Sequence, residues 1–161
     1  MPHIGNERNE EMIYHVFDLD GTVINSSHRY RTLPNGDIDL PYWLEQAEKR
    51  EKVFADTLFP LVHHMRNLYM RGEHVIICTS RTIHPHWIDF IDTHQIFCTA
   101  LLARPEGVND GDADLKEYML DEYFSGLGTC LDNVRAVMYE DHLGVIERLS
   151  SRGVFCSIQR N

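Results

Sequence analysis

The fold is decided by the stretch Met12-Ile13-Tyr14-His15-Val16-Phe17-Asp18-Leu19-Asp20-Gly21-Thr22, an apolar run that ends in two carboxylates. A nearly continuous apolar run predicts a central strand of a parallel sheet over residues 12–18. Residues two apart on a strand point to the same side, so Asp18 and Asp20 can act on one substrate. Gly21 permits a sharp exit from the strand, and the Thr22 hydroxyl can fix the turn. Taken alone, the stretch also fits a strand that ends in an ordinary Asp-Gly turn.

Strand and helix patterns alternate along the rest of the chain. Further strands are predicted at residues 74–78, 99–103, 134–139 and 154–158, and helices at 41–50, 56–71, 85–94, 112–124 and 142–151. Asp112 stands where it can cap its helix. The alternation predicts an α/β fold, with a Rossmann-like parallel sheet of about five strands and helices on both faces. Ligands of such sheets bind beyond the carboxyl ends of the strands.

The length of the chain fits one domain. With 161 residues, 43% of them hydrophobic, we expect a single domain over residues 1–161 with one core. Residues 1–11 are polar and are expected to be loose. Residues 23–55 separate the first strand from its helix and form an insertion, or flap. Because this insertion is too short for a large independent domain, we expect a minimal cap or none over the site.

The net charge and the cysteine pattern limit the cellular compartment and the kinds of partner that are expected. A net charge of −10 argues against a protein that coats nucleic acid, although a local site can still hold one phosphate. No apolar run approaches the roughly 18 residues of a membrane span, so no membrane partner is expected. The four cysteines are widely separated and the histidines lack the spacing of zinc ligands. We therefore expect no zinc and a cytoplasmic protein.

Polar residues suited to phosphoryl transfer follow the predicted strands. Six of them stand at strand ends or near a helix start: Asp18, Asp20, Thr79, Lys116, Glu140 and Asp141. Each has an ordinary interpretation as a cap or a solvated charge. Together they provide a nucleophile in Asp18 and a proton carrier in Asp20. The set predicts transfer of a phosphoryl group to a carboxylate.

The other members of this set supply positive charge and orientation. Lys116 and a Mg²⁺ ion would neutralise the phosphoryl oxygens, and Thr79 would orient them. Magnesium prefers oxygen ligands, which Asp18 can supply together with Asp141 or Glu140. The backbone carbonyl of Asp20 is a candidate third ligand.

The order of these motifs is similar to that of the haloacid dehalogenase-like (HAD) phosphatase superfamily. The matching elements, spread over residues 12–158, are Asp18-Leu19-Asp20-Gly21-Thr22, Thr79, Lys116 and Glu140-Asp141. The resemblance implies the fold of that superfamily, Mg²⁺ as cofactor and an aspartyl-phosphate intermediate on Asp18.

A finer pattern resembles the 3′-phosphatase domain of bacteriophage polynucleotide kinase-phosphatase. Its elements here are Arg29, Ser80, Arg81, Arg104 and Asp112, for which the resemblance implies a role in binding the substrate phosphate. Arginine offers forked donors that suit phosphate oxygens, although ordinary loop arginines are the alternative. If the protein is phage-encoded, its location is the host cytoplasm.

The chain departs from that pattern in two places. Glu140-Asp141-His142 stands where the family has Asp-Asp-Arg, which leaves the metal ligand open between Glu140 and Asp141, with Asp141 favoured. Ser80 replaces a glycine. The sequence also holds no G-x-x-x-x-G-K-[ST] phosphate loop, so if this chain heals nucleic-acid ends it only removes the phosphate, and pairing with a separate kinase or ligase is left open.

The leading hypothesis is a Mg²⁺-dependent phosphomonoesterase that removes 3′-phosphates from polynucleotide ends during nucleic-acid repair. The acidic net charge favours an alternative, a 5′- or 3′-nucleotidase or small-molecule phosphatase of the same superfamily. A non-catalytic binding module is a third. In the insertion, Tyr30, Tyr42 and Trp43 can stack on a base, or they can seal the insertion.

Overall fold

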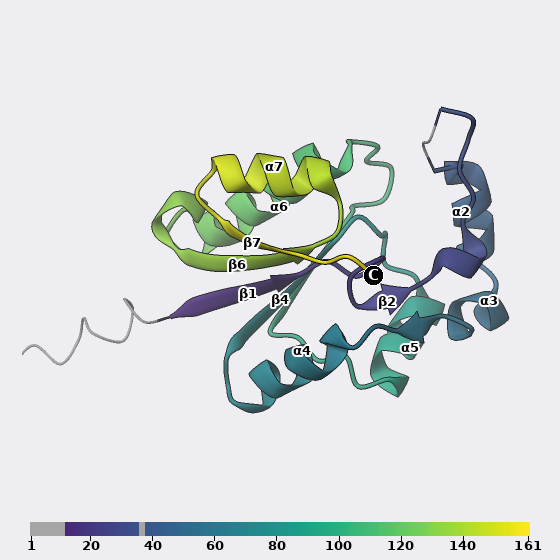
Figure 1. Ribbon diagram of the computed structural model, residues 1–161, viewed down its shortest axis with the longest axis horizontal. Helices are drawn as coiled ribbons and strands as arrows, with labels where there is room; N and C mark the ends of the chain where they lie inside the picture. Colours follow the sequence, from purple (N-terminus) through teal and green to yellow (C-terminus); the bar gives the residue numbers. More distant parts are fainter. Residues whose placement is uncertain (1–11, 36–37) are drawn as a thin grey trace, which may run out of the picture.

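The computed structural model describes residues 12–35 and 38–161 (Figure 1). The expectation for residues 1–11 lies outside this part of the chain. The strands are β1 (Ile13–Phe17), β2 (Ile24–Asn25), β3 (Thr57–Leu58), β4 (His74–Thr79), β5 (Ala100–Ala103), β6 (Arg135–Glu140) and β7 (Phe155–Ile158). The α-helices are α2 (Leu40–Ala47), α3 (Arg50–Phe54), α4 (Leu61–Met70), α5 (Pro85–Thr93), α6 (Asp112–Gly126) and α7 (Leu143–Ser151). Short 3₁₀ turns cover Ser27–Arg29 and Leu131–Asn133.

The main sheet has five strands in the order β5-β4-β1-β6-β7, and every neighbouring pair is parallel. The first strand is central, with Val16 between Ile76 of β4 and Met138 of β6. This position explains its apolar run, because a central strand is covered on both faces. The predicted parallel sheet is confirmed.

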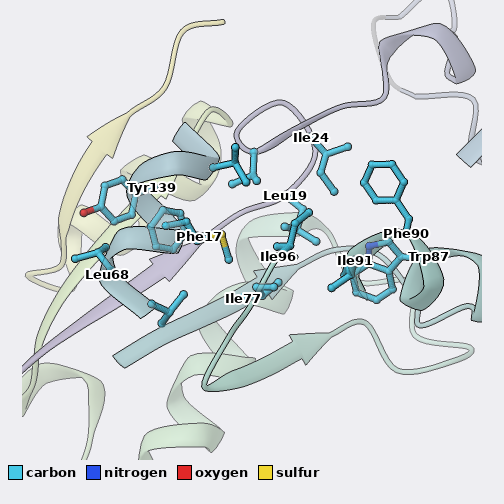
Figure 2. Packing of buried hydrophobic residues seen from close by; sticks show 14 of the residues in the cluster. Phe17, Leu19, Ile24, Leu68, Ile77, Trp87, Phe90, Ile91, Ile96 and Tyr139 are labelled. Carbon is cyan, nitrogen blue, oxygen red and sulfur yellow. The ribbon is translucent and has the colours of Figure 1, made fainter. Parts of the chain in front are cut away.

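Helices cover both faces of the sheet (Figure 1). On one face, Phe17 and Ile77 pack in a core with residues of α4 and α5. On the other face, Val16 and Ile76 pack with residues of α6 and α7. Figure 2 shows the first of these cores, where the rings of Phe17 and Tyr139 stack with centroids 4.3 Å apart. Burial of each such side chain contributes about 1.5–3 kcal/mol to the free energy of folding.

The segment between β1 and α4, which includes the insertion, contains elements that the sequence patterns did not predict. Strands β2 and β3 pair antiparallel, with Ile24 opposite Leu58, and the short helix α3 packs against α5. The helix expected over residues 56–71 therefore begins only at Leu61, because the preceding residues are extended and pair with β2. Figure 1 shows α3 beside α5 and α2 above α3 in the view, beyond the carboxyl end of the sheet.

The start of α6 also differs from expectation. Gly111 is the N-cap, and Asp112 is the first residue of the helix without a capping hydrogen bond. The predicted cap is therefore wrong. The Asp112 carboxylate instead lies 3.5 Å from the Arg104 guanidinium, which competes with the helix backbone for its oxygens. In the part of the chain described, no helix combines the length and the apolarity needed to cross a bilayer.

Candidate active site

A pocket of about 910 Å³ lies beyond the carboxyl ends of β1, β4 and β6. The side chains that the sequence singled out and that line it are Asp18, Asp20, Thr79, Ser80, Arg81, Arg104, Asp112, Lys116, Glu140 and Asp141. Arg29 is outside this lining. Segments far apart in sequence thus meet at one edge of the sheet, as expected for a doubly wound fold.

Lys116 joins the acidic side chains at this edge. Its Nζ donates to Oδ1 of Asp18 at 2.7 Å and to Oε2 of Glu140 at 2.8 Å, and all three side chains are buried. The hydroxyl of Thr22 donates to the other Asp18 oxygen at 2.8 Å. Asp18 is therefore held at both oxygens, which fixes the direction of the candidate nucleophile.

Glu140 and Asp141 differ in how much of each carboxylate is already bonded. The second oxygen of Glu140 accepts from the backbone N–H groups of Asp141 at 3.2 Å and His142 at 3.1 Å. Asp141 is exposed to the pocket, and its carboxylate accepts a long 3.5 Å contact from the Thr22 hydroxyl. Among the described residues, Asp18, Glu140 and Asp141 form one group whose ligand oxygens lie within 4.8 Å of one another.

We call Asp18, Lys116, Glu140 and Asp141 the acid cluster, and its charges do not balance. Three carboxylates face one ammonium. Burial would lower the pKa of Lys116, but Asp18 and Glu140 outweigh burial and raise it, so the ammonium stays charged. Burial and the charge of Asp18 raise the pKa of both Glu140 and Asp141. The cluster therefore holds more carboxyl groups than its one ammonium can balance in ionised form, and a hard divalent cation that binds oxygen donors would favour their ionised state.

Gly21 lets Asp141 approach the turn after β1. Its φ of +84° is one that side chains disfavour, as expected for the sharp exit from the strand. A Cβ at this position would also lie 2.1 Å from Oδ2 of Asp141. The glycine thus leaves the space that the Asp141 carboxylate fills, a requirement that the sequence alone did not reveal.

Asp20 is bound by Arg81. The guanidinium of Arg81 donates to both Asp20 oxygens at 2.6 Å, and the hydroxyl of Ser26 donates to one of them at 2.6 Å. Burial would raise the pKa of Asp20, but the charge and hydrogen bonds of Arg81, with the bond from Ser26, lower it. The carboxylate form of Asp20 is therefore favoured in this state of the site.

Asp56, which the sequence analysis missed, extends this pairing into the insertion. It accepts two hydrogen bonds from Arg29, at 2.9 and 3.0 Å, and a 3.5 Å contact from Arg81. The side chains of Arg29 and Asp56 are almost completely buried. Arg29, expected to bind phosphate, is therefore a buried partner of Asp56. We call Arg29, Arg81, Asp20 and Asp56 the arginine network.

Arg104 and Thr79 hold loops at the edge of the pocket. The Arg104 guanidinium donates to the backbone carbonyls of Ser80 at 2.8 Å, Val108 at 3.1 Å and Asp110 at 2.8 Å. The Thr79 hydroxyl accepts from the backbone N–H of Arg81 at 3.1 Å. The hydroxyl of Ser80 is buried and has no hydrogen-bond partner among the described residues.

The aromatic residues of the insertion separate into two groups. Tyr30 and Trp43 line the pocket, whereas Tyr42 lies outside the lining and packs under the guanidinium of Arg31 at 4.1 Å. The Arg29 guanidinium carbon lies 4.3 Å from the centroid of the Trp43 ring. Trp43 thus both covers the arginine network and faces the pocket.

Known proteins match this chain in sequence. Residues 7–101 match the family model described as bacteriophage T5 5′-deoxynucleotidase. A 5′-deoxynucleotidase of Escherichia phage T5 is 29% identical over 158 residues, covering 86% of this chain and 63% of that protein. The chain thus spans somewhat less than two thirds of the length of this relative.

Solved structures match the fold. A structure of the Pnkp1/Rnl/Hen1 complex has a TM-score of 0.63 at 20% identity and covers 91% of this chain and 45% of the matched chain. A haloacid dehalogenase-like hydrolase from Streptococcus pneumoniae has a TM-score of 0.64 at 12% identity, over 90% of this chain and 83% of that one. A HAD-superfamily hydrolase from Geobacter sulfurreducens has a TM-score of 0.63 at 12% identity, over 91% and 89%. The chain has the haloacid dehalogenase-like fold and belongs to the bacteriophage T5 5′-deoxynucleotidase family.

Proposed function

We propose that this chain is a Mg²⁺-dependent phosphomonoesterase that acts on nucleotides through an aspartyl-phosphate at Asp18. The acid cluster is the observation that carries this proposal. Asp18 is held by Lys116 at 2.7 Å and by Thr22 at 2.8 Å, beside carboxylates whose charge one ammonium does not neutralise. A fixed carboxylate next to a cation site is the arrangement that attack on a phosphate ester requires.

Asp18 and Asp141 would hold the Mg²⁺ ion, with the Asp20 backbone carbonyl as a further ligand. We assign Asp141 in preference to Glu140 because Asp141 is exposed to the pocket, whereas Glu140 is fully buried and accepts from Lys116 and from two backbone N–H groups. When bound, Mg²⁺ would act as a Lewis acid that neutralises charge on the phosphoryl oxygens.

Different side chains of the site would carry out the attack and the proton transfers of the proposed reaction. Asp20, a carboxylate in the free site, would take up a proton as the substrate phosphate competes for its Arg81 partner. An Asp18 oxygen then attacks phosphorus, the ester P–O bond breaks, and the leaving oxygen takes the proton from Asp20. A water that attacks the aspartyl-phosphate then gives its proton to Asp20, which releases phosphate and restores Asp18. Arg81 lines the pocket and contacts Asp20, so it is placed to share its guanidinium with the substrate phosphate.

A mononucleotide is the substrate that we propose first. Of the three arginines expected to bind phosphates of a polymer end, Arg29 is buried against Asp56 and Arg104 is bound to backbone carbonyls. Arg81 lines the pocket, and its guanidinium pairs with the candidate proton carrier Asp20. Together with the net charge of −10, this favours a small substrate over a polyanion. Membership in the phage T5 5′-deoxynucleotidase family supports 5′-deoxynucleotides.

A polynucleotide 3′-phosphate is the second candidate. The exposed Arg160 lines the same pocket as Arg81 and could bind a phosphate next to the terminal one. A 3′-phosphatase of this kind would work beside a separate kinase or ligase.

Phosphate release separates the two candidates. The protein would be assayed with Mg²⁺ on 5′- and 3′-deoxynucleoside monophosphates and on a 3′-phosphorylated oligonucleotide. Higher kcat/KM on a 5′-monophosphate is the expected result, and higher kcat/KM on the oligonucleotide would select the second candidate.

Substitution of the nucleophile tests the mechanism. Asp18→Asn keeps the shape of the side chain but removes its nucleophilic oxygen, so we expect kcat to fall by about 10⁴-fold. A chelator should abolish turnover by the unchanged protein. A rate for Asp18→Asn close to that of the parent would rule out the covalent intermediate.

A further inference from the structure

The insertion lines part of the pocket with both polar and apolar side chains. Its apolar side chains are those of Tyr30, Ile38, Leu40 and Trp43, and Phe59, directly after β3, adds a further ring to this apolar wall. Three of these side chains remain open to solvent, with exposed fractions of 41% for Tyr30, 51% for Ile38 and 48% for Leu40. Apolar surface left exposed beside a charged site marks a place where a ligand is expected to cover it.

Two aromatic rings form the centre of this wall. The centroids of Tyr30 and Trp43 lie 6.4 Å apart with a 58° angle between the ring planes. Trp43 is fixed by the Arg29 guanidinium, 4.3 Å from its centroid, and Arg29 is itself locked in the buried pair with Asp56. A ring held in this way is an ordered surface for stacking, because little side-chain entropy is lost when a ligand binds.

The aromatic wall lies one side chain away from the reacting groups. The guanidinium carbon of Arg81 is 5.8 Å from the Trp43 centroid, while nitrogens of the same guanidinium contact Asp20 at 2.6 Å. Arg81 thus links the Trp43 ring to Asp20, and Asp18, Tyr30 and Trp43 line the same pocket. This arrangement suits a nucleotide, which carries a phosphate and a flat base in one molecule.

We propose that Tyr30 and Trp43 form the subsite for the base of a nucleoside monophosphate, an inference that rests on the proposed function. The base stacks on these rings while its phosphate reaches the acid cluster. If the rings only sealed the insertion, Tyr30 would be covered, and it is not. Every base can stack on aromatic side chains. The subsite should therefore favour nucleotides over other phosphate esters but discriminate little among bases.

The test compares two substrates that differ only in the base. We would measure kcat/KM for a 5′-deoxynucleoside monophosphate and for 2-deoxyribose 5-phosphate, in the parent protein and in Tyr30→Ala. Loss of one stacking ring should lower kcat/KM for the nucleotide by about 5- to 100-fold, mainly through KM. For the sugar phosphate, kcat/KM should stay within about twofold. Tyr30→Phe, which keeps the ring, should restore the preference for the nucleotide.

Tyr118→Ala is the matched control. Tyr118 is an exposed tyrosine of α6 outside the pocket lining, so its removal should change neither substrate. An equal loss on both substrates in Tyr30→Ala would overturn the subsite, because the residue would then serve the fold or the chemistry. An unchanged nucleotide rate in Tyr30→Ala would overturn it as well.

Binding separates this inference from the proposed function. In the Asp18→Asn background, calorimetry would compare the Kd of the nucleotide with that of 2-deoxyribose 5-phosphate, with and without Tyr30→Ala. Tighter nucleotide binding that depends on Tyr30 supports the subsite. If the parent protein then turns over neither compound, the proposed function is wrong while the subsite stands. Equal Kd values for the two compounds would overturn the subsite whatever the activity.

Discussion

The acid cluster and the arginine network contain the same kinds of group but differ in charge balance. In the acid cluster, one buried ammonium faces three carboxylates. In the arginine network, two guanidiniums face two carboxylates, with contacts from 2.6 to 3.5 Å. The first has more carboxylates than cationic groups, whereas the second has equal numbers of guanidiniums and carboxylates. Buried charge by itself therefore does not indicate a metal site, whereas an excess of buried carboxylates favours one.

This difference in charge balance determines how the loss of one carboxylate charge should change the stability of the protein. In the arginine network, the change strands a buried guanidinium that water cannot reach. In the acid cluster, it relieves repulsion among carboxylates that burial has already disfavoured. The same substitution of aspartate by asparagine should therefore change stability in opposite directions in the two places.

The largest effect on stability is expected for Asp56→Asn. Asparagine keeps the shape but leaves Arg29, with an almost completely buried side chain, without its counter-charge. The free energy of unfolding should fall by about 3–5 kcal/mol, measured by urea denaturation.

Substitution of both Asp56 and Arg29 shows whether the loss of stability comes from their ion pair. Asp56→Asn combined with Arg29→Met should lose clearly less stability than the sum of the two single changes. Additive losses would mean that each residue acts through other contacts.

A smaller effect is expected when Mg²⁺ completes the acid cluster. At roughly 100 times its Kd, Mg²⁺ should raise the free energy of unfolding of the parent by about 2.7 kcal/mol. Asp141→Asn should lose most of this gain, because it removes the carboxylate that faces the pocket. Thermal unfolding with Mg²⁺ and with a chelator measures both.

Asp114→Asn provides the control for this measurement. Asp114 is an exposed residue of α6 that pairs with Arg148 and does not line the pocket, so its variant should respond to Mg²⁺ as the parent does. A full Mg²⁺ response in Asp141→Asn would place the ion elsewhere.

The acid cluster could be found from the sequence because its members follow from local patterns. Each strand of the main sheet was visible as an apolar run, and parallel strands bring their carboxyl ends to one edge. Asp18 and Glu140-Asp141 stand at those ends, and Lys116 stands near the start of a helix beside them. The geometry of the fold then brings them together without any knowledge of individual contacts.

The arginine network could not be found in the same way. Arg29 and Asp56 meet because β2 pairs with β3, two strands of two residues each, which are too short to leave a periodic pattern. Arg29 resembled a phosphate ligand in sequence, and Asp56 resembled an acid at the start of a helix. Their pairing depends on contacts between segments inside an irregular insertion, which no local pattern in this sequence indicates.

The smallest expected effect tests whether loss of a carboxylate charge from the acid cluster raises stability, in contrast to the arginine network. Because the pKa of Asp141 is higher in the folded protein than in an unfolded chain, ionisation of this carboxyl favours unfolding at pH 8 when no cation is present. Asp141→Asn should therefore raise the free energy of unfolding in chelator, by about 0.5 kcal/mol for so exposed a group. The gain should fade as the pH falls through the raised pKa, because the parent carboxyl then takes up a proton. Urea titrations of both proteins at pH 8 and pH 5 measure this difference. A loss of stability in Asp141→Asn at pH 8 would show that the acid cluster is balanced without a cation, and the contrast with the arginine network would no longer hold.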